Sequence, residues 1–233
     1  MITLPDLAFA CFVYGGLSNY DESYLDFLML SDGAPDLGNP NHREALLKWL
    51  NKWGCRQFAV KYHDHASREI LSWHSAYAST LFPRDRKLQE LSEPELTTAG
   101  AAYDSLSRRI ASHRTREGRS QAISFGPTGT SKILFAIRPH ALPPWDDAIR
   151  EGLGYDKSQA SYVSFVRHVQ SLLEELAGRC ERRGFRLADL PKVLGRPHST
   201  VAKLIDEYYW VTLTKGCSPP DPGALRRWAS WSQ

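Results

Sequence analysis

Hydrophobic residues along the chain recur mostly at spacings of three and four, which is the pattern of helices with one buried face. The most regular stretch, residues 162–176, would place one apolar stripe along a helix of about five turns. Similar patterns cover residues 46–53, 70–81 and 99–110, whereas the two-residue alternation of strands is limited to 121–125 and 210–214. We therefore predict a mainly helical, compact, bundle-like fold with little or no sheet.

The domain organisation follows from the distribution of prolines. Residues 1–217 should form a single mainly helical unit, or two helical lobes with a cleft near residues 120–150. Residues 218–233 begin with a Pro-rich stretch and contain Trp228 and Trp231, so we expect a linker and a tail there.

Composition excludes several classes of protein. With 233 residues, 42% hydrophobic residues, 24% charged residues and a net charge of +3, the chain has an ordinary globular composition and is neither collagen-like nor disordered. The apolar run at residues 7–14 is too short to span a membrane and follows no basic segment, so we expect a cytoplasmic protein. Neither the widely spaced cysteines nor the histidines near residues 63–74 match a metal signature, and we expect no metal and no cofactor.

Charge is distributed unevenly. Between residues 108 and 119 the only acidic residue is Glu117, against five arginines, namely Arg108, Arg109, Arg114, Arg116 and Arg119. This basic stretch is either a contact for a polyanion or a solvated helix end.

Residues 125–154 are the segment in which chemistry is expected. A turn with glycine and proline leads into a short helix, whose N-terminus Thr130 or Ser131 can cap. The free backbone N–H groups at that N-terminus, together with Lys132, could hold a phosphate. The Pro143–Pro144 pair then returns the chain to Asp146 and Asp147, one of which should open a second helix. A purely structural capping aspartate is the simpler interpretation of that pair.

This order of elements resembles the helix-hairpin-helix DNA glycosylases, whose hairpin grips the DNA backbone and whose aspartate faces a flipped base. The resemblance implies that Gly126 and Gly129 form the hairpin turn, that Lys132 supplies an amine and that Asp146 is the essential carboxylate, with Asp147 in its place if the register slips by one. It also implies double-stranded DNA as the partner, including modified phage DNA.

Cleavage of an N-glycosidic bond makes the sugar cationic, so a carboxylate such as Asp146 can stabilise it or orient a water. Lys132 would pair with phosphate, or attack the anomeric carbon to form a Schiff base. The candidates for DNA contact are Gly126, Thr128, Gly129, Thr130, Ser131, Arg109, Arg114, Arg116 and Arg119.

A flipped base also needs a pocket of aromatic and polar side chains. The candidates for that pocket are Trp145, Asp147, Trp49, Trp53, Arg56 and Tyr14. Trp49 and Trp53 lie on a hydrophobic helix face, so burial in the core is the alternative for both.

Residues 187–208 suggest a second interpretation, a non-catalytic DNA-binding protein with a helix-turn-helix. Its second helix would present Ser199, Thr200 and Lys203 to a DNA groove, with Val201, Leu204 and Ile205 packed inward. Pro191 inside the first helix favours an ordinary helical turn instead. A helical scaffold with no role in nucleic-acid binding is the third alternative.

Overall fold

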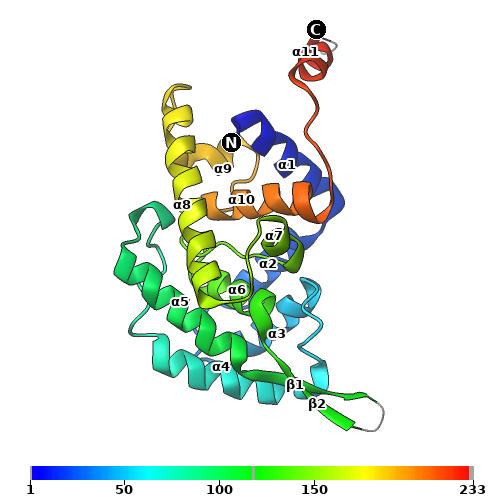
Figure 1. Cartoon of the computed structure of the whole chain (residues 1–233), viewed down its shortest axis with the longest axis vertical. Helices are drawn as coiled ribbons and strands as arrows, with labels where there is room; N and C mark the ends of the chain where they lie inside the picture. The colour runs from blue at the N-terminus through cyan, green and yellow to red at the C-terminus, as the bar shows by residue number, and fades with distance from the viewer. Residues whose placement is uncertain (1, 117–118, 231–233) are drawn as a thin grey trace.

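The computed structural model of the chain describes residues 2–116 and 119–230. Eleven α-helices and one two-stranded sheet make up this part, so the predicted mainly helical fold is confirmed. In chain order (Figure 1) the helices are α1 (Leu4–Leu17), α2 (Tyr20–Met29), α3 (Pro40–Lys52), α4 (His63–Tyr77), α5 (Glu93–Arg108), α6 (Gly126–Ile137), α7 (Asp147–Gly152), α8 (Gln159–Glu181), α9 (Leu190–Val193), α10 (Val201–Tyr209) and α11 (Pro222–Ser230). The shorter turns of other helix types are η1 (Val60–Tyr62), η2 (Leu88–Glu90), η3 (Leu187–Asp189) and η4 (Trp210–Thr214).

The long helix α8 carries the apolar stripe predicted for residues 162–176, and every hydrophobic residue of that pattern is buried. The helix starts where the Ser158 hydroxyl accepts a hydrogen bond from the Ser161 amide at 3.1 Å. Its stripe packs against α5, where a Cβ on Gly100 would collide with the side chain of Val163. The glycine therefore permits a close approach of the two helices.

The core is centred where α6 and α8 meet the segment that precedes α7. Trp145 is fully buried there, with its ring centroid 5.0 Å from that of Phe165 and 5.5 Å from that of Tyr162. The prediction that Trp145 lines a base pocket is wrong, because the whole return segment 141–145 is buried. The prediction for Trp49 is also wrong, since its ring is 2% exposed and stacks on Phe27 at 5.1 Å.

The sheet is an antiparallel hairpin of β1 (Ile110–Arg116) and β2 (Arg119–Ser124), with Arg114 opposite Gln121. This hairpin, called the arm below, projects beyond the helices in Figure 1. The strand predicted at 121–125 is thus largely confirmed, whereas the one predicted at 210–214 is wrong. Those residues form the π-helical turn η4, because Thr212 donates its hydroxyl to the Tyr208 carbonyl at 2.8 Å and Val211 is buried beside Tyr14.

The C-terminal helix α11 stands apart from the other helices in Figure 1, after a connection that contains Pro219 and Pro220. The side chain of Trp228 and the whole of Trp231 lie outside the described residues. No described helix combines the length and the hydrophobicity that a membrane span requires.

We predict that Trp145→Ala lowers the free energy of unfolding by about 3–5 kcal/mol, since it removes a fully buried ring and leaves a cavity. Urea denaturation monitored by circular dichroism measures the change. The matched control is Phe12→Ala, at a ring that is 83% exposed, which should change the free energy by less than about 0.5 kcal/mol. Equal effects of the two substitutions would contradict a core position for Trp145.

Candidate active-site cleft

A cleft of about 490 Å³ brings together most of the sequence-predicted catalytic and base-pocket residues. This volume lies in the range of small-molecule sites. Its walls come from α1, the start of α2, the loop after α3, α6, the start of α7 and the end of α10 with η4. The predicted residues that line it are Tyr14, Trp53, Arg56, Thr128, Lys132, Asp146 and Asp147.

Asp146, and not Asp147, is the cap of α7, and it also lines the cleft. Its side chain caps α7, with Oδ1 accepting a hydrogen bond from the Ile149 amide at 2.8 Å. Its other oxygen, Oδ2, accepts from the Thr214 hydroxyl at 2.9 Å, and the residue lines the cleft. The carboxylate is therefore a helix cap held in a fixed orientation at the wall of the cleft.

Lys132 lies in the second turn of α6 rather than at its head. Its ammonium group donates to the Trp53 carbonyl at 2.7 Å and lies 5.4 Å from the centre of the Trp53 ring. Nearby, burial raises the pKa of the Cys55 thiol against the opposing effect of Lys132, so this cleft-lining thiol stays protonated.

Asp147 lies at the mouth of the cleft, with its side chain 69% exposed. It pairs with Arg150, and the Thr128 hydroxyl donates to it at 3.4 Å. The guanidinium of Arg150 is itself buried and also reaches Glu151 at 3.0 Å. An aspartate committed to a buried arginine is a poorer candidate for catalysis than Asp146.

Aromatic rings form much of the cleft wall. Tyr14 and Tyr20 lie against Trp210, with ring centroids 5.2 Å and 5.9 Å from it, and Tyr20 lies 6.0 Å from Trp53. All four residues line the cleft. Planar ligands gain stacking energy on such surfaces. Sequence reasoning identified Tyr14 and Trp53 but missed Tyr20 and Trp210, because nothing in the sequence brings these segments together.

Behind the ring of Tyr14 lies a buried group of charges that sequence reasoning missed. The Lys203 ammonium lies 4.3 Å from the centre of that ring and pairs with Asp206 at 2.5 Å and Glu207 at 3.9 Å. Glu207 also pairs with Arg196 at 2.9 Å. The available signal was a lysine followed at three and four positions by acids, within a helix face that is otherwise apolar.

Burial sets the protonation of this group. It raises the pKa of Asp206 and of Glu207, and the positive charge of Lys203 opposes that rise. Burial alone would lower the pKa of Lys203, but attraction to Asp206 outweighs it and holds that pKa above its ordinary value. Lys203 therefore stays protonated although it is almost fully buried.

The start of α6 differs from the predicted hairpin. A β-hairpin, not a helix, precedes it, and residues 127–131 form its first turns, where Pro127 is tolerated. Gly126 makes the entry turn with φ of 66°. A Cβ on Gly129 would collide with Gln57 and Phe58, so its role is packing.

Thr130 and Ser131 are fully buried, so their predicted contact with DNA is wrong. The Ser131 hydroxyl instead donates to the Trp145 carbonyl at 3.0 Å.

The predicted basic contacts are divided between the arm and its base. Arg114 and Arg119 are exposed on the arm. Arg109 pairs with Glu69 at 3.0 Å, so its predicted role in binding phosphate is not favoured. The side chain of Arg116 lies outside the described part of the chain.

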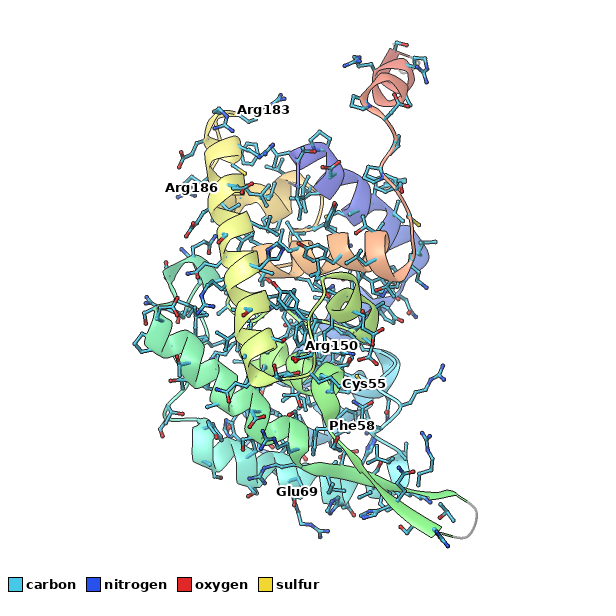
Figure 2. The ribbon with its side chains drawn as sticks, viewed as in Figure 1. Cys55, Phe58, Glu69, Arg150, Arg183 and Arg186 are labelled. Atoms are coloured by element: carbon cyan, nitrogen blue, oxygen red, sulfur yellow. The ribbon has the colours of Figure 1, made fainter. Side chains whose placement is uncertain are left out.

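The arm is tied to the cleft through the loop after α3. The Ser112 hydroxyl of β1 donates to the Gln57 carbonyl at 2.6 Å, and Gln57 lines the cleft beside Arg56. Figure 2 shows Cys55 of this loop near Arg150 of α7, and Phe58 where the arm leaves the body. A ligand extending out of the cleft past this loop would meet the arm.

The predicted helix-turn-helix does not present its side chains. Lys203 is 4% exposed, and the Thr200 hydroxyl donates to the Pro139 carbonyl at 2.7 Å. The first helix, α9, is only four residues long. Leu204 and Ile205 are buried as predicted.

No group of three potential metal-ligating side chains is found among residues 2–116 and 119–230. Comparison with known proteins finds no matching family model, no matching curated protein and no matching solved structure.

We predict that stability falls as the pH rises above about 10, the ordinary pKa of tyrosine. Burial raises the pKa of Tyr14, so the folded state retains a proton that the unfolded chain loses in this range. Tyr14→Phe should make the decline shallower by up to about 1.4 kcal/mol per pH unit between pH 10.5 and 12. Chemical denaturation at a series of pH values measures both slopes, and an unchanged slope would contradict a neutral, buried Tyr14.

Proposed function

We propose that this chain is a DNA glycosylase-like enzyme that takes a damaged or modified base from duplex DNA into the cleft and hydrolyses its N-glycosidic bond, in base repair or in defence against phage. The observation that carries the proposal is the convergence of Asp146 and Lys132 with aromatic rings in one cleft of about 490 Å³. The resemblance of residues 125–154 to helix-hairpin-helix glycosylases is one of sequence, since a β-hairpin precedes α6 and both Gly126 and Gly129 lie within that helix, but it points to the same carboxylate and amine. A ring-lined pocket suits a flipped base, and a carboxylate beside the sugar can stabilise the positive charge that develops as the bond breaks.

In the proposed reaction the bond between the base nitrogen and the anomeric carbon breaks, and its electron pair leaves with the base. The Asp146 carboxylate stabilises the cationic sugar and accepts a proton from the attacking water, whose oxygen forms the new bond to the anomeric carbon. The departing base takes up a proton from solvent, and an abasic sugar remains. The hydrogen bonds from Ile149 and Thr214 hold Asp146 in place before the substrate arrives.

Lys132 has the simpler role of a fixed positive charge. Its ammonium is held by a hydrogen bond to the Trp53 carbonyl at the wall of the cleft, where it would pair with a phosphate next to the flipped nucleotide. Attack by this amine on the sugar would first require loss of that hydrogen bond and of a proton.

The alternative of a non-catalytic DNA-binding protein with a helix-turn-helix has little support. Its predicted contacts Thr200 and Lys203 are both engaged within the protein. No other observation favours it over the cleft.

We predict that Asp146→Asn abolishes base excision while duplex DNA is still bound. Asparagine is an equally good helix cap, so α7 should be preserved and only the negative charge lost. The measurement is the formation of alkali-labile sites in duplexes that carry damaged or phage-type modified bases, with a loss of at least about 100-fold expected.

The matched control is Asp104→Asn, which removes an aspartate that pairs with Arg108 on α5 and leaves the cleft intact. Excision that persists in Asp146→Asn would exclude Asp146 as the catalytic carboxylate. If the wild-type protein bound DNA but produced no abasic sites from any duplex, the glycosylase proposal itself would fail.

We also predict that the arm binds the DNA backbone. Replacing Arg114 and Arg119 by alanine should weaken binding to a duplex and reduce the slope of log K against log salt by about 2, one unit for each lost phosphate contact. Fluorescence anisotropy at several salt concentrations measures the slope.

The control replaces the exposed Arg182 and Arg183, which directly follow α8, by alanine. Figure 2 shows Arg183 at the far end of the molecule from Glu69 and the arm. This control removes the same charge and should leave the slope nearly unchanged. Equal effects of the two double variants would show that only net charge matters.

A further inference from the structure

Asp206 is the carboxylate in the cleft whose hydrogen-bonding capacity is half used. It lies on α10, its side chain is 10% exposed, and it lines the cleft. Its Oδ2 accepts from the Lys203 ammonium at 2.5 Å, whereas no donor from the described residues reaches Oδ1. Both oxygens of Asp146, in contrast, are occupied by donors of the protein.

The orientation of Asp206 is fixed from behind. The Lys203 ammonium that binds it also donates to the Tyr14 hydroxyl at 3.2 Å and lies 5.2 Å from the centre of the Trp53 ring. A carboxylate held in this way cannot turn to satisfy its second oxygen elsewhere. Oδ1 is not among the fully buried atoms and borders the open cleft, so a ligand that covers it must supply an N–H group or leave it without a donor, which is costly.

The surroundings restrict what such a ligand can be. Asp206 shares the cleft with the rings of Tyr14, Trp53 and Trp210, which suit a planar heteroaromatic ring. In uracil the ring N3–H lies between two carbonyl oxygens, and in hypoxanthine the N1–H lies beside one, and a carboxylate repels these oxygens. An exocyclic amino group extends beyond its neighbouring ring atoms, and acidic side chains accept hydrogen bonds from the amino group of cytosine.

We propose that Asp206 determines the base specificity of the cleft by accepting a hydrogen bond from the exocyclic amino group of a flipped base. The preferred substrates are then adenine, cytosine or guanine derivatives that retain this group, and bases without it are rejected. This inference rests on the proposed function of the cleft as a base pocket, but it assigns no role in bond cleavage to Asp206.

The test uses nucleobases methylated at the nitrogen that carries the sugar, so that no N–H is present at that position. Calorimetry compares 9-methyladenine with 9-methylpurine, and 1-methylcytosine with 1-methyl-2-pyrimidinone, each pair differing by one amino group. We expect the wild-type protein to bind the amino member of at least one pair about tenfold or more tightly, as for hydrogen bonds to a charged group. A short duplex with one bulged base of that pair should compete for the site.

Two variants separate recognition from folding. Asp206→Asn should reduce the preference to less than about threefold, because the neutral amide is a weaker acceptor. The double variant Lys203→Met with Asp206→Leu replaces the buried ion pair by apolar side chains of similar size, and Glu207 keeps its partner Arg196 at 2.9 Å. This double variant should abolish the preference. Thermal unfolding verifies that both variants are folded, and Asp104→Asn serves as the control that retains the preference.

The outcomes distinguish this inference from the proposed function. Asp146→Asn should lose excision and keep the amino preference, because its carboxylate is not the acceptor. Excision by the wild-type protein without any amino preference would overturn the role of Asp206 and leave the glycosylase proposal standing. An amino preference that depends on Asp206, found without excision of any base, would support the role of Asp206 and overturn the glycosylase proposal. No binding of any of the four compounds, or failure of the bulged duplex to compete, would overturn the recognition of a flipped base by Asp206.

Discussion

Two hydrogen bonds between Ser131 and Trp145 fix the geometry on which the cleft depends. The buried hydroxyl of Ser131 donates to the Trp145 carbonyl at 3.0 Å and accepts from the Trp145 amide at 3.2 Å. The next residues in the chain are Lys132 and Asp146, so this link determines how the ammonium and the carboxylate of the cleft are placed relative to each other. Because an unpaired polar group in this position would cost free energy, the link also favours one packing of the return segment over others.

The buried charges behind the cleft impose a second constraint. Apolar side chains of the same volume often stabilise a protein as much as a buried ion pair, or more. Stability alone therefore does not explain why Lys203, Asp206 and Glu207 are buried. What the pairing provides is a rigid wall, since Lys203 joins α10 to Tyr14 of α1. The ion pair also makes this wall vulnerable to substitution, because removal of either charged side chain leaves the other buried without a counter-charge.

The sequence predicted the helices well where a hydrophobic period was long, as in α8, and it correctly placed an aspartate cap at the Asp146–Asp147 pair, because both depend on neighbours in the chain. The predictions from sequence failed where contacts between distant segments determine the local structure. Trp145 and Trp53 are both buried in the core, with Trp53 5% exposed, yet only Trp53 also borders the cleft. The alternation at 210–214 resembled a strand, but with Val211 packed beside Tyr14 of α1 the segment continues α10 as η4. The charges of α10 had a recognisable spacing, but whether they faced solvent or the core depended on α1.

The two carboxylates of the cleft are distinguished by how completely the protein satisfies them. Asp146 receives a backbone amide and a hydroxyl, neither of which carries a formal charge, and in the proposed reaction this carboxylate faces the electron-poor sugar. Asp206 shares its charge with a buried ammonium and has one oxygen left for a ligand. A carboxylate that must respond to a developing charge benefits from being fixed in advance, because no reorganisation is then needed during the reaction. A carboxylate that must select among bases benefits from an unmet hydrogen bond, since a wrong base then leaves it unpaired.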